Sequence, residues 1–290
     1  MLKKRLIATL IIREGTVVQS INFCRFLPVG KPAIAVEFLN SWGIDEIIIL
    51  DITASKNQVL KNYAFIEQLS RACFVPLTVG GGINSIEDVH ALLRYGADKV
   101  VINAHCLSDP DFITEVAEVF GSQCVVVSID VIGSDRSEYH VYNAASDILT
   151  DIDPVEWAQN VEAKGAGEIF LTSVDRDGSK NGYDLDLIDL VASQVKIPVI
   201  ASGGAGNPGH ILDVFSKTNA SAVSASNFFH FFEHSVILTK SVLRDNQSDV
   251  RLNTHAEYSG SRYGIDFRLK KQSDAYLQDL LFEKIEKEII

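Results

Sequence analysis

Four aspartates near the ends of apolar runs, Asp51, Asp130, Asp175 and Asp177, are the residues of this 290-residue chain best suited to proton transfer. Asp130 directly follows an apolar run, and a carboxylate there has few structural partners nearby in sequence, which favours general acid–base catalysis. Capping of the next helix is the alternative for Asp130. For Asp51 the two alternatives are evenly balanced, because Thr53 can cap the same turn. Asp177 and the following Gly178 can form a plain turn.

Two glycine-rich segments share one order of residue types: a proline, a short apolar run and then glycines. They are Val75–Ile83 and Ile197–Ala205, which contain Gly81, Gly82, Gly203 and Gly204. Each predicts a buried strand that opens into a loop almost without side chains, where bare backbone N–H groups near a helix N-terminus bind an anion. Two such loops indicate a substrate that carries a phosphate at each end.

Four charged residues each immediately precede a buried apolar run, namely Arg5, Glu46, Lys99 and Glu168. If the runs are parallel strands of one barrel, their starts gather at its lower end, where these side chains can meet at the axis. Two positive and two negative charges form a neutral ring, which lowers the cost of partial burial. The pattern therefore predicts a ring of ion pairs that gates the axis, with water-exposed rim charges as the alternative.

The elements that must position these residues are short Ile- and Val-rich runs that alternate with segments of helical period. Continuously apolar runs are typical of strands buried on both faces of a parallel sheet. Eight of them within roughly 250 residues predict a (β/α)8 TIM barrel, with chemistry at the C-terminal ends of the strands. An open doubly wound sheet is the alternative, disfavoured because no GxGxxG motif follows the first strand. The predicted strands are Leu6–Ile12, Ile47–Leu50, Leu77–Val79, Val100–Ile102, Val125–Ile129, Ile169–Leu171, Val199–Ala201 and Ala222–Ser224.

The two glycine-rich segments are offset by 122 residues, from Pro76 to Pro198, which is near half of the first 250. The offset predicts two fused half-barrels, although any barrel with two phosphate loops looks repetitive. We assign residues 1–250 to the barrel and 251–290 to a C-terminal extension. The extension ends in a charged amphipathic helix, which either docks or is solvated. Its apolar face consists of Tyr276, Leu277, Leu280, Leu281 and Ile285.

Composition restricts the partners. The formal net charge is −12, so we expect no binding to nucleic acid or to an anionic membrane surface. No apolar stretch approaches the roughly 18 residues that span a bilayer. The four cysteines are scattered without metal-ligand spacing, which predicts reduced thiols and a cytoplasmic location. The seven histidines are dispersed as well, so we expect neither a metal site nor a cofactor.

The chain also resembles the cyclase subunit family of imidazole glycerol phosphate synthase. The resemblance covers almost all of residues 1–250 without a large gap and does not include the tail. The matching segments are 38–47, 50–55, 78–83, 96–103, 120–130, 165–169, 171–178 and 200–206. It implies a phosphate-binding barrel of the ribulose-phosphate type, built by half-barrel duplication, with a glutaminase subunit docked at the lower end. Ammonia from that partner would pass a salt-bridge gate and attack a bisphosphorylated ribulosyl substrate at the top.

The resemblance also assigns roles to individual residues. Arg5, Glu46, Lys99 and Glu168 fall on the family's gate, and Asp130 matches one of its two catalytic aspartates. One phosphate loop comprises Gly82, Asn103 and Ala104 together with Gly81. The other comprises Gly178, Gly204, Ala225 and Ser226, together with Asp177 and Gly203.

Two positions depart from the family pattern. Ile11 occupies the position of the first catalytic aspartate, and Gln19 replaces a lysine that helps to hold substrate. Isoleucine cannot transfer a proton, and loss of one positioned acid or base typically costs about 10²–10⁴-fold in rate. The combination resembles a branch of the family assigned to acetamidino modification of sugars in surface polysaccharide biosynthesis, which we favour. The alternatives are an authentic histidine-pathway cyclase, with Asp51 assisting Asp130, and a non-catalytic scaffold that binds a phosphosugar.

Overall fold

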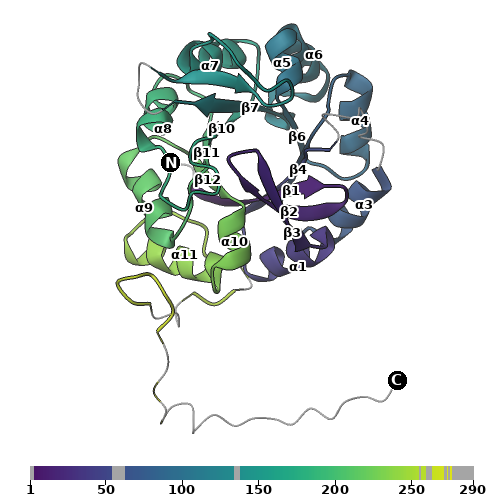
Figure 1. Cartoon of the computed structure of the whole chain (residues 1–290). Helices are drawn as coiled ribbons and strands as arrows, with labels where there is room; N and C mark the ends of the chain where they lie inside the picture. The colour runs from purple at the N-terminus through teal and green to yellow at the C-terminus, as the bar shows by residue number, and fades with distance from the viewer. Residues whose placement is uncertain are drawn as a thin grey trace, which may run out of the picture.

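Eight parallel strands close into a barrel, and helices surround it (Figure 1). The computed structural model describes residues 3–53, 63–133, 138–254, 256–258, 263–270, 273 and 275. The barrel closes where β1 pairs with β12 in parallel register. In order around the barrel, the strands are β1 (Arg5–Arg13), β4 (Glu46–Asp51), β5 (Leu77–Gly80), β6 (Lys99–Ile102), β7 (Val125–Ile132), β10 (Glu168–Ser173), β11 (Val199–Ser202) and β12 (Ala222–Ala225). All eight predicted runs lie within these strands, so the predicted TIM barrel is confirmed.

The outer layer consists of helices whose ends follow local capping signals. Asp153 caps α7 by accepting hydrogen bonds from the backbone N–H groups of Val155 and Glu156, at 2.8 and 3.0 Å. The main helices are α1 (Pro32–Ser41), α3 (Tyr63–Ala72), α4 (Ile86–Arg94), α6 (Asp111–Phe120), α7 (Pro154–Ala163), α8 (Leu185–Ala192), α9 (Pro208–Lys217) and α11 (Ser235–Asp245). Two short helices, α5 (Ala104–Ser108) and α10 (Asn227–Phe231), follow β6 and β12, and a 3-10 turn (Ser122–Cys124) precedes β7.

The helical pattern of the sequence predicts helices at 33–42, 58–71, 86–95, 111–120, 155–164 and 185–195, which correspond to α1, α3, α4, α6, α7 and α8. A further helix was expected between the second glycine-rich segment and the last apolar run, where α9 lies, whereas α11 was not predicted. The amphipathic signal of α11 is weak because the helix buries polar residues, among them Thr239, Lys240 and Ser241. Part of the segment predicted as helix before α3, residues 58–62, lies outside the described residues.

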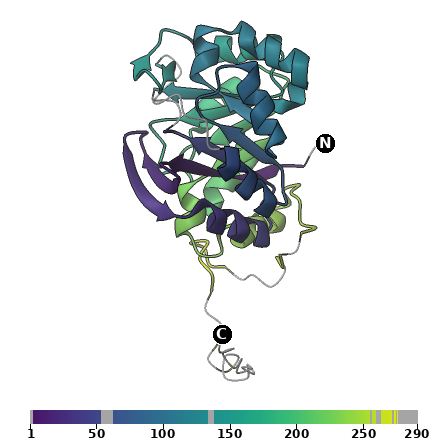
Figure 2. The same ribbon diagram turned by 90° about the vertical axis from the view of Figure 1, so that its right-hand side faces the viewer.

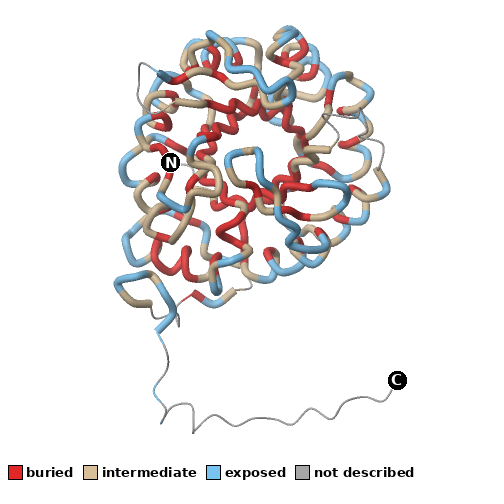
Figure 3. Tube along the Cα trace, in the orientation of Figure 1, coloured by how far each residue is buried: buried red, intermediate tan, exposed pale blue. Residues whose placement is uncertain are grey.

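Side chains alternate between the inside of the barrel and the layer of helices. On β1, Ile7 belongs to the interior cluster, whereas Leu6 and Ala8 pack against the helix layer. Figure 3 shows the resulting ring of buried residues inside a more exposed shell. This alternation decides which charged and polar residues of each strand reach the axis.

Two antiparallel hairpins extend the sheet at the C-terminal ends of the barrel strands. One is formed by β2 (Thr16–Ile21) and β3 (Arg25–Gly30) after β1, and the other by β8 (His140–Asn143) and β9 (Ile148–Leu149) after β7. In Figure 1 the first hairpin lies across the barrel mouth, and Figure 2 shows it on the side opposite the N-terminus. The end of the barrel where strands finish is thus partly covered, and we call this end the upper mouth.

The C-terminal extension begins at the opposite end, the lower mouth. Lys4 forms a parallel bridge with Val250, and the buried ammonium of Lys240 donates to the backbone oxygen of Arg251 at 2.9 Å. A side chain at Gly43, in the turn before β4, would clash with Tyr258. The extension therefore packs on the barrel, while the predicted terminal helix over residues 276–285 lies outside the described residues.

Candidate functional site

The four charged residues predicted to meet at the lower mouth do so. Arg5 donates to Glu46 at 2.6 Å and to Glu168 at 2.9 Å. Lys99 donates to Glu168 at 2.6 Å and lies 3.5 Å from Glu46. Each cation thus contacts both carboxylates, and the four side chains form a closed ring, which we call the gate ring. The alternative of separate, water-exposed rim charges is wrong for these residues.

The gate ring favours the charged forms of Glu168 and Arg5. Burial acts to raise the pKa of Glu168, but attraction and hydrogen bonds from Arg5 and Lys99 outweigh it and lower this pKa below the ordinary value. For Arg5, burial acts to lower the pKa, and the two carboxylates raise it overall. Two positive and two negative side chains, with a net charge of zero, therefore lie together at this end of the barrel.

Above the gate ring the barrel interior changes from apolar to polar. The next layer includes Ile7, Ile48 and Phe170, all almost fully buried. Further along, the hydroxyls of Thr9 and Ser224 lie 2.6 Å apart. A neutral small molecule can cross such an apolar layer at lower cost than an ion of the same size, because an ion would lose its hydration there.

Asp130 lies at the upper end of this interior, on β7. Asp130 is only 4% exposed to solvent. Its carboxylate accepts hydrogen bonds from the side-chain amide of Asn103 at 2.7 Å and from the hydroxyl of Ser128 at 3.5 Å. Burial raises the pKa of Asp130 to about 7, although these two hydrogen bonds oppose the shift. A carboxyl group with this pKa can both donate and accept a proton near neutral pH.

The other acid–base candidates occupy different places. Ile11 is buried near the end of β1, and alternation from Ile7 assigns it to the interior. Asp51 is the last residue of β4 and directly follows Leu50, which packs on the interior cluster. Because neighbouring strand residues point to opposite faces of the sheet, alternation assigns Asp51 to the side away from the barrel interior. The Asp51 carboxylate also accepts from the backbone N–H of Thr53 at 2.9 Å, the capping contact that the sequence offered as its alternative role.

The first glycine-rich loop follows β5 and has left-handed backbone at Gly81 and Gly82. A Cβ atom at Gly81 would lie 2.2 Å from the backbone oxygen of Asp51, so only glycine fits there. Asn103 and Ala104, also predicted for this loop, lie at the end of β6 and the start of α5. The structure links Asn103 to Asp130 through its side chain, so this residue connects the predicted phosphate loop to the predicted acid.

The second loop system lies around the opposite strands. Gly203 and Gly204 follow β11, again with left-handed backbone, and Ala225 and Ser226 lie between β12 and α10. β5 and β11 are the third and seventh strands around the barrel, so the two glycine loops face each other across the upper mouth. The Ser226 hydroxyl is buried and has no hydrogen-bond partner among the described residues, as expected of a group that awaits a ligand.

Asp177 and Gly178 serve the β2–β3 hairpin. The Asp177 carboxylate accepts from the Ser20 hydroxyl at 2.6 Å and from the backbone N–H of Phe23 at 3.3 Å. Burial raises the pKa of Asp177. A Cβ at Gly178 would lie 2.6 Å from the backbone oxygen of Ser20. Both residues therefore fix the hairpin that also carries Gln19, and their contact with a phosphate stays a prediction.

Sequence reasoning missed three polar residues near these loops. The hydroxyl of Thr172 is buried without a hydrogen-bond partner in the described part of the chain, and Thr172 is in register with Asp130. Asn227 donates to the backbone oxygen of Ser20 at 2.6 Å and so holds the hairpin from the other side. Lys180 lines a surface cavity next to the second loop. For Thr172, its position one residue beyond an apolar strand core was the available signal.

Comparison with known proteins identifies the family. The family described as histidine biosynthesis protein matches residues 5–235. The imidazole glycerol phosphate synthase subunit HisF of Bacillus cereus (strain G9842) is 46% identical over 252 residues, which are 87% of this chain and 100% of that protein. The chain belongs to the HisF family.

Other HisF relatives differ in how far the alignment extends. The HisF subunit of Streptococcus mutans serotype c (strain ATCC 700610 / UA159) is 42% identical over 251 residues, 87% of this chain and 100% of that protein. A Vibrio vulnificus (strain YJ016) protein named as imidazole glycerol phosphate synthase subunit hisF2 is 43% identical over 267 residues, 92% of this chain and 97% of that protein. Since 267 exceeds the 250 residues assigned to the barrel, that alignment must include part of the extension.

The structure also addresses two other classes of site. Among the described residues, no three His, Cys, Asp or Glu side chains are grouped as ligands of a metal ion. In the same part of the chain, no helix combines the length and apolarity needed to cross a membrane. These observations add no site to the two mouths of the barrel.

Proposed function

We propose that this chain is the synthase subunit of a glutamine amidotransferase pair and that it carries out the cyclase reaction of imidazole glycerol phosphate synthase. A glutaminase subunit docks at the lower mouth and releases ammonia, which passes the gate ring. The ammonia attacks a bisphosphorylated ribulosyl substrate at the upper mouth, and imidazole glycerol phosphate and an aminoimidazole carboxamide ribotide are formed. The observation that carries this proposal is the pairing of the gate ring at one end with Asp130 at the other.

The interior between the two mouths suits ammonia as the transported species. The apolar layer above the gate ring favours neutral ammonia over ammonium, because only the ion must give up strong hydration. At the upper mouth, Asp130 is placed to transfer protons, with Asn103 orienting its carboxylate. The glycine loops after β5 and β11 hold the two phosphates of the substrate by backbone N–H groups, and the Ser226 hydroxyl donates to the second phosphate.

A second candidate is the sequence-based hypothesis of acetamidino-sugar formation, in which the ammonia is passed to a further amidating enzyme. Two observations favour it. Ile11 leaves Asp130 without the second catalytic aspartate of the family pattern, and the hisF2 relative aligns with part of the extension. The names of the relatives aligned over about 252 residues support the cyclase reaction instead, so we place the acetamidino function second.

One experiment separates these functions. The purified full chain is given the ribulosyl substrate with ammonium chloride at high pH, where more of the ammonia is unprotonated. The wild type, Asp130→Asn, Ile11→Asp and the double variant Ile11→Asp/Gln19→Lys are compared. Formation of imidazole glycerol phosphate by the wild type, and its loss in Asp130→Asn, is the result expected for the cyclase.

The opposite pattern favours the second candidate. If the wild type is inactive and Ile11→Asp gains turnover, the barrel is intact and only the missing acid blocks ring closure. Restoring one positioned acid or base is expected to raise the rate by about 10²–10⁴-fold. If no variant turns over and an added glutaminase subunit neither binds nor is stimulated, both functions are contradicted and the phosphosugar-binding scaffold is left.

A further inference from the structure

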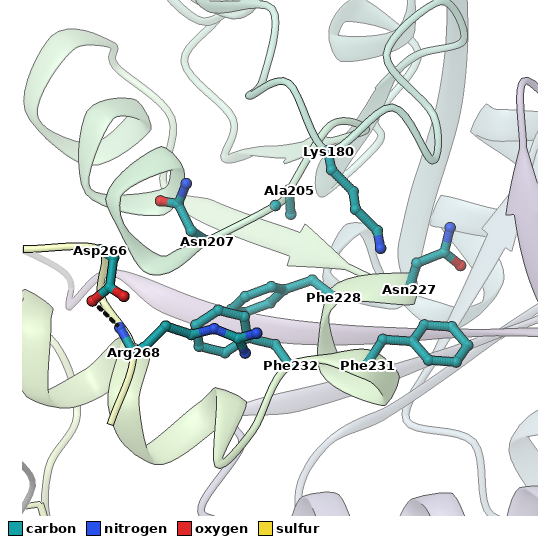
Figure 4. Close-up of a pocket in the computed structure, with 10 residues that line it drawn as sticks. Lys180, Ala205, Asn207, Asn227, Phe228, Phe231, Phe232, Asp266 and Arg268 are labelled. Atoms are coloured by element: carbon teal, nitrogen blue, oxygen red, sulfur yellow. Dashed lines mark hydrogen bonds between the residues drawn. The ribbon is translucent and has the colours of Figure 1, made fainter. Parts of the chain in front are cut away.

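A cavity of about 290 Å³ lies beside the second phosphate loop, where the C-terminal extension meets the barrel (Figure 4). One wall comes from the loop after β11 and the start of α9, which includes Asn207. The floor is formed by phenylalanines of the α10 region, including Phe228 and Phe232. Two cations reach toward the cavity from different elements: Lys180 from the loop after β10, and Arg268 from the extension.

Contacts along the extension hold Arg268 in this position. Its guanidinium group lies over the ring of Phe232, 5.1 Å from the ring centre, and 3.8 Å from the carboxylate of Glu233. Glu233 also accepts from the backbone N–H of Leu269 at 3.2 Å, which ties the segment to the end of α10. Phe267, the residue before Arg268, packs against Gly209 of α9. A Cβ atom at Gly209 would lie 2.5 Å from the Phe267 ring.

Lys180 is held by its backbone. Its φ angle is 61°, in the left-handed region that residues other than glycine rarely adopt. A Cβ at Gly206 would lie 2.3 Å from the backbone oxygen of Lys180, so this loop packs directly on the next one. Within the described residues the Lys180 ammonium takes part in no ion pair or hydrogen bond, unlike the ammonium groups of Lys99 and Lys240.

Charged groups of both signs surround the cavity, and they differ in how they are engaged. Asp266 is the acidic residue of the lining, and its carboxylate accepts from the backbone N–H of Arg268 at 3.1 Å, a contact within its own turn. Glu233 is engaged by Arg268 and Leu269. Lys180 therefore keeps an unpaired positive charge within the described part of the chain. The guanidinium of Arg268, over the Phe232 ring, still carries N–H groups that can donate to an anion.

We propose that this cavity is a third anion subsite beside the two phosphate loops, which binds a phosphate or carboxylate group between Lys180 and Arg268 while the phenylalanine floor packs against the apolar part of the same ligand. The proposal rests on the proposed function in one respect: the ligand spans from the second phosphate loop into this cavity. Because Arg268 lies in the extension, the subsite belongs to those HisF proteins that carry this segment. It would select substrates with an additional anionic group.

The test uses the full chain in two measurements. Crystals are soaked in sodium tungstate, a tetrahedral dianion whose anomalous signal locates it, and inorganic phosphate is titrated by calorimetry. The variants are Arg268→Ala, Arg268→Lys and Lys180→Ala. Lys270→Ala is the matched control, because it removes one positive charge two residues away and outside the cavity lining. Malonate is titrated in parallel to separate carboxylate from phosphate recognition.

We expect an anomalous peak between Lys180 and Arg268, distinct from any peak at the two glycine loops. Loss of a charge-assisted hydrogen bond predicts about 10- to 100-fold weaker phosphate binding at this site in Arg268→Ala and Lys180→Ala. Arg268→Lys should retain part of the affinity and Lys270→Ala all of it. Tighter binding of malonate than of phosphate would assign the subsite to carboxylates.

Two results would overturn the proposal. Tungstate at the glycine loops but not in the cavity would contradict the subsite and leave the phosphate loops of the proposed function intact. A peak in the cavity combined with unchanged phosphate affinity in Arg268→Ala would identify an adventitious ion only. Conversely, anion binding in the cavity without binding at the glycine loops would support the subsite and count against the proposed function.

Discussion

Glu168 at the lower mouth and Asp130 at the upper mouth are two buried carboxylates of one barrel, with opposite acid–base behaviour. Their exposed fractions are similar, 9% and 4%. Glu168 contacts two cations, and its pKa is lowered. Asp130 contacts a neutral amide and a hydroxyl, and its pKa is raised to about 7.

For these two carboxylates, the charge of the hydrogen-bond partners, more than the extent of burial, decides the direction of the pKa shift. A carboxylate paired with cations stays charged and serves as part of a structural plug. One that is surrounded by neutral donors exchanges protons near neutral pH and can serve in catalysis. Four changes test this contrast, and they are ordered here by the size of the expected effect.

The largest effect is expected for Asp130→Asn. An asparagine still accepts the hydrogen bond from Asn103 but cannot transfer a proton, so ammonia-dependent turnover should fall by about 10²–10⁴-fold. Steady-state kinetics with ammonium chloride measures this. The matched control is Asp175→Asn, an exposed aspartate near the same mouth that accepts from the backbone of Gly133 at 2.9 Å. Equal losses in both variants would contradict a special role for Asp130.

Next in size is the effect of Lys240→Met on stability. Lys240 is fully buried and forms an ion pair with Asp45 at 2.7 Å, so its removal leaves a buried carboxylate without a cation. We expect the free energy of unfolding to fall by roughly 3–5 kcal/mol. Urea unfolding followed by circular dichroism measures it. The control Lys217→Met removes a surface partner of Asp213 and should change stability by less than about 1 kcal/mol.

For Glu168→Gln we expect a smaller loss of stability, together with a loss of ammonia transfer from the glutaminase partner to the upper mouth. The glutamine leaves Arg5 and Lys99 with only one carboxylate to share, and we expect a cost of about 1–3 kcal/mol. With the glutaminase partner present, the ratio of glutamine-dependent to ammonium-dependent turnover should also fall. Glu67→Gln, which breaks a surface pair with Arg71, is the control. An unchanged ratio in Glu168→Gln would contradict a gating function for the ring.

The pH dependence of stability gives the smallest effect. The folded-state pKa of Asp130 lies above its ordinary value of 3.8, so the folded state binds its proton more tightly. Relative to Asp130→Asn, the wild type should lose stability progressively as the pH rises from about 4 to about 7. The lowered pKa of Glu168 has the opposite sign: its stabilisation is present at neutral pH and is lost in acid. Parallel urea titrations between pH 4 and pH 8 test both signs.

Much of the barrel could be predicted because its signals are local. Each strand was visible as a continuous apolar run, and the charges preceding four of these runs indicated the gate ring. The β2–β3 hairpin was not predicted, although it covers the upper mouth. Its anchors, Asp177 and Asn227, lie more than 150 residues away in sequence from Ser20, which they hold.

From the sequence alone, the barrel and the membership of the gate ring could be predicted. The catalytic role of Asp130, with Ile11 in place of a second aspartate, stays a prediction from the family resemblance. The contact from Asn103 to Asp130, and the position of Arg268 at a cavity beside the second loop, became visible in the tertiary structure alone. The reason is physical. Alternation, capping and glycine turns depend on neighbours along the chain, whereas a hydrogen-bond partner or a cavity wall depends on which distant segments the closed barrel brings together.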